Sequence, residues 1–257
     1  MKKFLLATVA LAALSAPAMA ADLATKYPVK AVAVVPVFSW TGFYIGANAG
    51  YGGNSFNFDE TKIDNYASRT PIDANYSDSL NSSGFFVGGQ IGYNYQFANN
   101  VVVGLETDLQ WSNIEGKHDY TTVYSWGGIE TGSRGASVDY FGTIRARLGY
   151  AFDRFLPYIT GGVAYGKTSA DFSGSRLYPN GYGYGWDASG SATNWGWTIG
   201  GGAEYAITNN WTFKTEYLYV DLGSNDYTYL TADTNHYYTG SVDTKFHTIK
   251  AGVNYKF

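Results

Sequence analysis

The sequence predicts an all-β protein, specifically an eight-stranded antiparallel up-and-down transmembrane β-barrel. Three observations lead to this prediction: a secretion signal at the start, segments that alternate apolar and polar residues, and an apolar face that ends in an aromatic at the last position. A secreted chain that crosses a membrane without a long apolar helix needs a closed barrel, because open sheet edges leave backbone groups unpaired in lipid. A secreted β-sandwich is the alternative fold.

Residues 1–20 are typical of a signal peptide. After a short basic start, Phe4–Leu14 is apolar, and Ala18-Met19-Ala20 is a small-x-small cleavage site. Residues 21–39 are rich in Ala, Val and Pro, and they predict a periplasmic leader because proline opposes regular structure. The barrel domain is predicted for residues 40–257. The chain has no cysteine, which excludes disulfides and thiol chemistry.

Eight segments have a period of two, which in a strand places alternate side chains on opposite faces. Short turns follow the second, fourth and sixth segments, and long polar gaps follow the first, third, fifth and seventh. Outer-membrane barrels have this asymmetry, because their turns lie in the periplasm and their loops lie outside the cell. The predicted strands are 41–51, 85–96, 101–112, 138–150, 157–165, 195–205, 211–220 and 242–257.

The outward face of the last segment predicts an assembly signal. Its apolar side chains alternate with polar ones that include two lysines, and the final residue is aromatic. We expect the barrel assembly machinery of the outer membrane to recognise this face. The predicted signal comprises Ile249, Ala251, Val253, Tyr255 and Phe257.

The charge and composition limit the classes of partner that the protein can bind. The formal net charge is −4, and the acidic balance leaves no basic patch to hold nucleic acid. Aromatic residues make up 18% of the chain and charged residues only 15%, which favours strands that face lipid over a highly solvated chain. We therefore expect the cell outer membrane as the location, with its lipid and lipopolysaccharide as neighbours.

Four stretches of the chain carry a family resemblance. They are Phe38–Gly52, Gly88–Asn94, Pro157–Gly166 and Glu216–Gly223. They resemble the strands of alphaproteobacterial outer-membrane immunogenic and haemin-binding proteins, which are grouped as porin-family β-barrels. The resemblance covers the mature chain through its strands but not its long loops. It implies a barrel similar to the transmembrane domain of outer membrane protein A and the role of a surface antigen.

Four acidic and four basic residues fall on the inward face of the predicted strands. An eight-stranded barrel is only wide enough for side chains to fill it, so unpaired charges inside would be costly. We expect Arg145 and Arg147 to pair with Glu106 and Asp108. The alternative is that the same charges line a selective path for ions. The full predicted network is Glu106, Asp108, Arg145, Arg147, Glu204, Lys214, Glu216 and Lys250, with the two lysines pairing with Glu204 and Glu216.

If the barrel is filled, function lies in the predicted extracellular loops, which a rigid scaffold presents. Their Tyr, Trp, Gly and Ser content resembles an adaptable recognition surface, for example for a host surface. The family resemblance raises haem binding as an alternative, beside porin-like passage of small solutes. The candidate haem ligands are His118, His236, Tyr237 and Tyr238.

The sequence does not predict an enzyme. His118 and His236 fall in predicted loops, and His247 falls on the outward face of the last strand. Ser241 and Asp243 lie near His247 in sequence, but no nucleophile motif surrounds them. The scattered acidic residues lack the spacing of a calcium loop, so no metal and no cofactor is predicted.

Overall fold

The computed structural model describes residues 38–64, 70–230 and 236–257. The predicted signal peptide and residues 21–37 of the predicted leader lie outside these ranges. The compact barrel unit spans Phe38–Phe257. It therefore begins two residues before the predicted boundary at Trp40.

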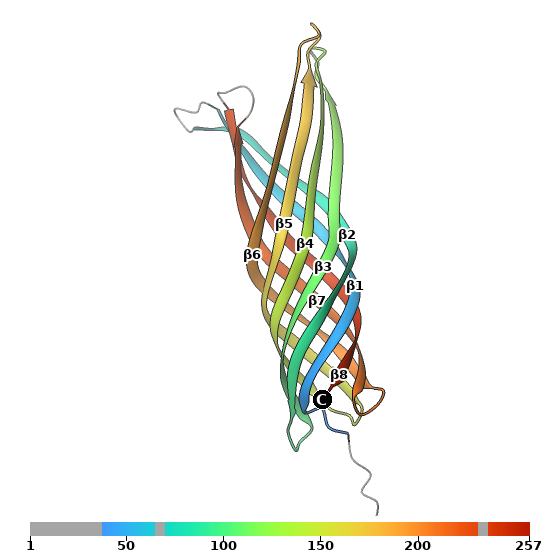
Figure 1. Ribbon diagram of the computed structural model, residues 1–257. Coiled ribbons are helices and arrows are strands. Elements are labelled where there is room, and N and C mark those ends of the chain that lie inside the picture. The colour runs from blue at the N-terminus through green and yellow to red at the C-terminus, as the bar shows by residue number, and fades with distance from the viewer. Residues whose placement is uncertain (1–37, 65–69, 231–235) are drawn as a thin grey trace, which may run out of the picture. The chain divides into compact units, whose positions relative to one another are not determined.

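Eight antiparallel strands close into a barrel in which each strand pairs with its neighbours in the sequence and β1 pairs with β8 (Figure 1). This confirms the predicted fold. Among the described residues, no helix is long and apolar enough to cross a membrane. The strands are β1 (Gly42–Asp64), β2 (Thr70–Gln96), β3 (Val101–Val123), β4 (Ile129–Tyr150), β5 (Phe155–Leu177), β6 (Gly183–Ala206), β7 (Trp211–Leu230) and β8 (His236–Lys256).

The strands extend much further than the sequence predicts. The gap from Lys167 to Thr193 was expected to be a loop, but β5 and β6 run through most of it and pair up to Leu177 and Gly183. The other three gaps are shortened in the same way. Alternating hydrophobicity marks a strand only where one face meets lipid or a core. The extensions consist largely of Gly, Ser, Thr and charged residues, so that signal is weak there.

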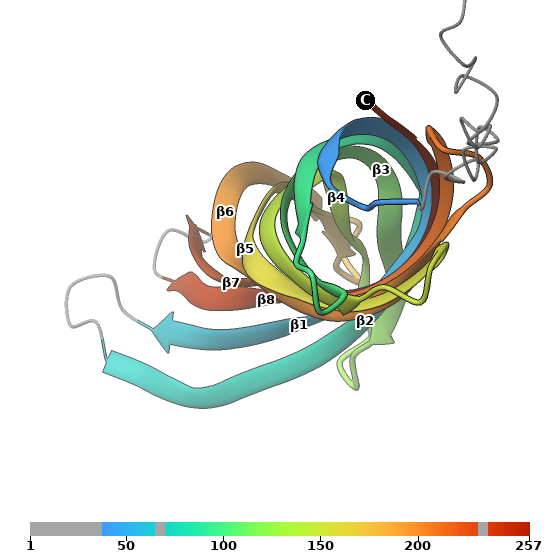
Figure 2. The same cartoon turned by 90° about the horizontal axis from the view of Figure 1, so that it is seen from below.

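Beyond the closed barrel, the strands separate into two four-stranded sheets. The β2–β3 pairing ends at Ser83↔Glu115, and the β6–β7 pairing ends at Trp197↔Asp221. The other ladders continue toward the extracellular ends of their strands. One sheet, called here the β3–β6 sheet, contains β3, β4, β5 and β6. The other contains β7, β8, β1 and β2, and the two diverge in both views (Figures 1 and 2).

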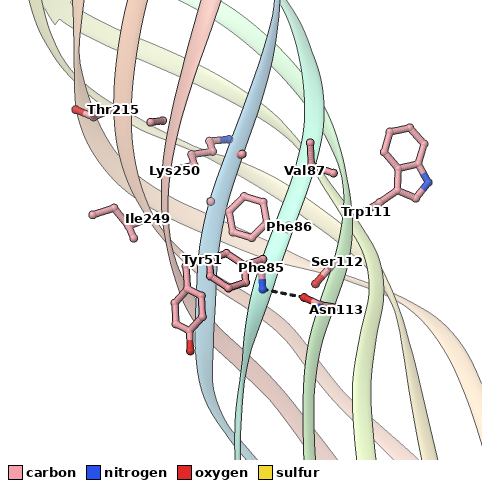
Figure 3. Close-up of a pocket in the computed structure, with 13 residues that line it drawn as sticks. Tyr51, Phe85, Phe86, Val87, Trp111, Ser112, Asn113, Thr215, Ile249 and Lys250 are labelled. Atoms are coloured by element: carbon pink, nitrogen blue, oxygen red, sulfur yellow. Dashed lines mark hydrogen bonds between the residues drawn. The ribbon is translucent and has the colours of Figure 1, made fainter.

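The outer face of the barrel is apolar, as expected of a surface in lipid. Figure 3 shows residues of β8, β1, β2 and β3, in which neighbouring side chains along a strand point alternately out of the barrel and into it. Phe85 and Trp111 are 70% and 62% exposed on the outside, whereas the neighbouring Phe86 lies inside and is buried. The backbone N–H of Phe85 donates a hydrogen bond of 2.8 Å to Asn113 Oδ1.

Candidate functional site in the barrel lumen

All eight charged residues of the predicted network lie inside the barrel, and none of them is more than 3% exposed. They come from β3, β4, β6, β7 and β8, on the face opposite to the lipid-facing one. The lumen therefore holds equal numbers of acidic and basic side chains. A buried charge is tolerated only when it is paired and hydrogen-bonded, so the detailed pairing decides how the lumen is filled.

Arg145 is the centre of the network. Its Nη2 lies 2.6 Å from Glu106 Oε1 and 2.9 Å from Asp108 Oδ2, and its Nη1 lies 2.9 Å from Glu216 Oε2. The contacts with Glu106 and Asp108 agree with the prediction. The contact with Glu216, on the other side of the barrel, was not predicted. One guanidinium thus contacts three carboxylates.

Arg147 has a different main partner from the predicted one. Its Nη2 lies 2.7 Å from Glu204 Oε2, and its Nη1 is 3.5 Å from Glu106 Oε2. Its guanidinium also lies over the ring of Tyr158, 3.9 Å from the ring centre, which adds a cation–π contact. The contact with Glu106 agrees with the prediction, whereas no ion pair between Arg147 and Asp108 is found among the described residues; the shorter contact of Arg147 is with Glu204 on β6.

The two lysines also differ in part from the prediction. Lys214 Nζ lies 2.8 Å from Glu106 Oε1 and 3.9 Å from Glu216 Oε2. Lys250 Nζ lies 2.7 Å from Asp108 Oδ2 and 3.0 Å from Glu216 Oε1. Both lysines therefore approach Glu216 as predicted. The expected lysine contact with Glu204 is wrong, because Arg147 takes that carboxylate.

Neutral side chains donate further hydrogen bonds to the carboxylates. Tyr44 Oη donates to Glu106 Oε2 at 2.7 Å, and Tyr158 Oη donates to Glu216 Oε2 at 2.9 Å. The remaining donors are Thr143 to Asp108 (2.8 Å), and Thr212 (2.5 Å) and Asn254 (2.7 Å) to Glu204. The sequence pattern does place Tyr44 on the inward face, but it contains no signal for the partner.

Glu106, Asp108 and Glu216 lie close enough together to resemble a metal site. Arg145 contacts all three carboxylates, and Lys214 and Lys250 add two more positive charges beside them. Their negative charge is already compensated by protein cations. The donor set therefore does not fit a cation.

Apolar layers lie on both sides of the charged network. At the periplasmic end, Phe38 and Trp40 pack with Val102, Leu156 and other buried residues. Trp40 Nε1 donates to the backbone oxygen of Asp153 at 3.0 Å, which fixes the segment before β1 against the turn between β4 and β5.

At the extracellular end, Phe86, Phe141 and Phe246 form a continuous aromatic cluster. The ring centre of Phe141 lies 5.3 Å from that of Phe86 and 5.1 Å from that of Phe246. Buried aliphatic side chains such as Ile114 and Leu218 surround the cluster. The barrel thus contains an apolar layer, a charged layer and a second apolar layer in series.

The residues of the predicted assembly signal all project outward from β8 or follow it, and all are exposed. The ring of Tyr255 packs edge-on against Phe257 and against Trp211 of β7. The backbone N–H of Phe257 donates to the carbonyl of Phe43 at 3.0 Å, so the last residue ties β8 to β1 at the seam of the barrel.

The four candidate haem ligands are divided between two sheets. His118 lies on β3, opposite Arg134 of β4. His236, Tyr237 and Tyr238 begin β8, which at this height belongs to the other sheet. His247 lies on the outer face, where its Nδ1 is 2.6 Å from Tyr217 Oη. The His247 ring also lies 5.1 Å from the ring of Tyr219, so it stands among aromatic side chains on the outer face.

A comparison with protein-family models agrees with this architecture. The family model described as "Outer membrane protein beta-barrel domain" matches residues 6–257. The 31 kDa outer-membrane immunogenic protein of Brucella melitensis is 43% identical over 265 residues, covering 100% of both chains. The 22 kDa outer membrane protein of Rhizobium leguminosarum bv. viciae is 33% identical, covering 76% of this chain and 70% of its own.

Among solved structures, the outer membrane protein OprG from Pseudomonas aeruginosa is similar with a TM-score of 0.44 and 15% identity, over 86% of this chain and 98% of its own. The matching family and the named relatives place this protein in the outer membrane. The chain belongs to the outer membrane protein β-barrel family.

Proposed function

We propose that the barrel is a non-conducting membrane anchor that displays its two extracellular sheets as a surface antigen for contact with host or environment. One observation carries the proposal: charged and apolar layers fill the lumen in series. A water-filled pore needs a continuous polar path. Here the aromatic cluster of Phe86, Phe141 and Phe246 lies across any such path at one end, and Trp40 lies across it at the other.

The charges themselves favour a structural role. Charges that select ions in a pore remain hydrated and free to contact the passing ion. The charged side chains of this lumen instead contact one another at 2.6–3.0 Å and are almost fully buried. Their mutual compensation supports a filled interior. Porin-like passage of small solutes therefore receives no support from the lumen geometry.

The role of a surface antigen is supported by the relatives named as outer-membrane immunogenic proteins. No geometry that supports catalysis or haem ligation is found among the described residues: the histidines lie apart, and His247 is engaged with Tyr217. The neighbours that we propose are outer-membrane lipid and lipopolysaccharide around the barrel, and the barrel assembly machinery during insertion.

Single-channel recording in planar lipid bilayers tests this proposal. We expect the purified wild-type barrel to insert, as shown by heat-modifiable migration on a gel, and to leave the membrane current at its baseline. A general porin reconstituted in the same bilayer is the positive control for detection. A steady, ion-selective current from the wild-type protein would contradict the anchor role and support the solute-channel alternative.

A further inference from the structure

The inner face of the β3–β6 sheet carries a group of aromatic rings that the barrel itself does not need. This face continues the lumen-facing side of the strands beyond the apolar layer at the extracellular end of the lumen. Along Asp171–Leu177, half-buried residues of this inner face alternate with exposed residues of the outer face. We call the group the aromatic platform. It comprises Tyr120, Tyr124, Trp126, Tyr178, Tyr184 and Trp186.

Two of the rings lie over glycines at the centre of the sheet. A side-chain carbon on Gly132 would collide with the ring of Tyr120, and one on Gly174 would collide with the ring of Trp186. Gly132 and Gly174 are themselves paired across β4 and β5. Tyr120 and Trp186 therefore lean over the sheet from opposite sides, and each ring covers a glycine.

The other rings form a continuous series near the tips of the hairpins. Trp126 stacks between Tyr124 and Tyr178, with ring centres 5.1 and 5.2 Å away. Tyr178 continues to Tyr184 at 6.3 Å, and Tyr184 continues to Trp186 at 5.8 Å. This series spans the β3–β4 and β5–β6 hairpins and joins them into one surface.

An ion pair lies in the row next to the two glycines. Glu130 of β4 faces Arg176 of β5, and Arg176 Nε donates to Glu130 Oε2 at 2.9 Å. Tyr124 Oη donates to the same carboxylate oxygen at 2.8 Å. Partial burial opposes the charged form of Arg176, but the hydrogen bonds and charge of Glu130 outweigh it, so the pKa of Arg176 is raised and the guanidinium stays charged.

The platform remains open to solvent. Its members in the strands are half-buried, and Trp126 is 47% exposed. The β2–β3 and β6–β7 ladders end below it, so the sheet containing β1 and β8 diverges from it (Figures 1 and 2). Rings that cover the glycines of a sheet, beside a charged hydrogen-bonding pair, combine an apolar surface with fixed polar groups.

We propose that the aromatic platform binds a chain of pyranose sugars, namely the polysaccharide of the lipopolysaccharide that surrounds the barrel. A pyranose ring has a C–H face that packs on the electron-rich face of an aromatic ring, and a rim of hydroxyl groups that a carboxylate and a guanidinium can bind. The rings of Trp186 and Tyr120 supply the first contact, and the Arg134 guanidinium, 5.7 Å from the centre of the Tyr120 ring, adds a further hydrogen-bond donor beside it. Glu130 and Arg176 supply the second.

The position of the platform argues for this source of sugar. The barrel anchors the site on the extracellular side of the membrane, inside the polysaccharide layer of the outer leaflet. A glycan tethered there is present at a high effective concentration, so a weak contact with each sugar ring is sufficient for occupancy. At this height the sheet is open at its β3 edge and its β6 edge, so an extended polysaccharide chain can lie across it.

The test measures binding of the polysaccharide released from the producing bacterium's lipopolysaccharide to the full barrel in nanodiscs, by biolayer interferometry. A neutral glucan and a host glycosaminoglycan are the comparison ligands. We expect the wild type to bind the released polysaccharide, and Tyr120→Ala or Trp186→Ala to weaken it at least about tenfold, which is about 1.4 kcal/mol at 25 °C. The matched control is Leu177→Ala, an apolar truncation on the opposite face of the same sheet.

Heat-modifiable migration checks that every variant is folded, so a loss of binding cannot be a loss of the barrel. This proposal rests on the display function proposed above. The two can fail separately, because polysaccharide binding is measured by interferometry and conduction by the bilayer current. Wild-type protein that does not bind, equal binding by Tyr120→Ala and Trp186→Ala, or stronger binding of the glycosaminoglycan would each overturn it.

Discussion

At the scale of single residues, the lumen shows how charge can fill a membrane barrel. Arg145 is surrounded by three carboxylates, and each of those carboxylates has at least one further cationic partner. Desolvation of each ion costs several kcal/mol, and only complete pairing offsets it. Removing one member alone therefore leaves a buried charge uncompensated, which destabilises the barrel.

We predict that Arg145→Ala destabilises the barrel by about 3–5 kcal/mol, the usual effect of leaving buried charges uncompensated. Urea unfolding, followed by the heat-modifiable band, measures the change. Adding Glu106→Ala to Arg145→Ala should restore part of the loss, because the numbers of acids and bases are again equal. Lys117→Ala, at an exposed position, is the control and should change stability by less than about 0.5 kcal/mol. Equal stability of Arg145→Ala and the control would contradict the pairing argument.

The membership of the network could be predicted from the sequence, but its pairing could not. Alternation alone places Glu106 and Arg147 on the inward side of their strands. Which of them meet depends on strand tilt and on contacts across the lumen, such as Arg147 with Glu204 of β6. A period of two carries no information about either.

At the scale of elements, the closure of the barrel depends on its last strand. β8 pairs with both β7 and β1, and the N–H of Phe257 reaches the carbonyl of Phe43. The outward aromatic and aliphatic side chains of β8 face the lipid beside the seam where β8 pairs with β1. The same residues form the proposed assembly signal.

Deleting Phe257, or replacing Tyr255 with Asp, should lower the amount of protein inserted in the outer membrane. The first change removes the terminal aromatic and a backbone hydrogen bond, and the second places a charge near the lipid interface. Quantifying the heat-modifiable fraction in isolated outer membranes measures the effect. Lys256→Ala, which keeps the outward face intact, serves as the matched control. Normal insertion of both altered chains would remove the assembly role of this face.

The extracellular strand extensions were missed in the sequence for a physical reason. Residues such as Ser169 and Ser191 are paired across β5 and β6, yet the segments around them are polar or small on both faces. In water, a strand gains no advantage from an apolar side, so its sequence resembles that of a loop. Only the backbone pairing distinguishes the two.

Cysteine cross-linking distinguishes the strand extensions from loops, because the natural chain has no cysteine. Ser169→Cys with Ser191→Cys should oxidise readily to a disulfide, since the two positions face each other in an antiparallel ladder. Ser191→Cys with Tyr227→Cys would be paired only if the β6–β7 ladder continued beyond Trp197↔Asp221, so we expect no cross-link. A shift in mobility on a non-reducing gel reports both results. Efficient formation of the second cross-link would show that the two sheets do not separate.

At the scale of the whole molecule, the barrel is closed by layers that act in series. The periplasmic apolar cluster, the charged network and the extracellular aromatic cluster each fill the cross-section with side chains. Stability and closure are therefore different properties. A change that weakens one layer lowers the free energy of unfolding, whereas the other two layers still block the path.

This separation gives a prediction for Phe141→Ala. Phe141 is 2% exposed and packs against both Phe86 and Phe246, so its truncation should cost about 3–5 kcal/mol in urea unfolding. The current through a planar bilayer should nevertheless stay at its baseline, because the Arg145 network and the Trp40 layer remain in place. Ile144→Ala, an apolar truncation on the lipid-facing side of the same strand, is the control for both measurements. Steady current from Phe141→Ala would mean that the aromatic cluster alone keeps the barrel closed, and that the charged layer beneath it is wet enough to conduct.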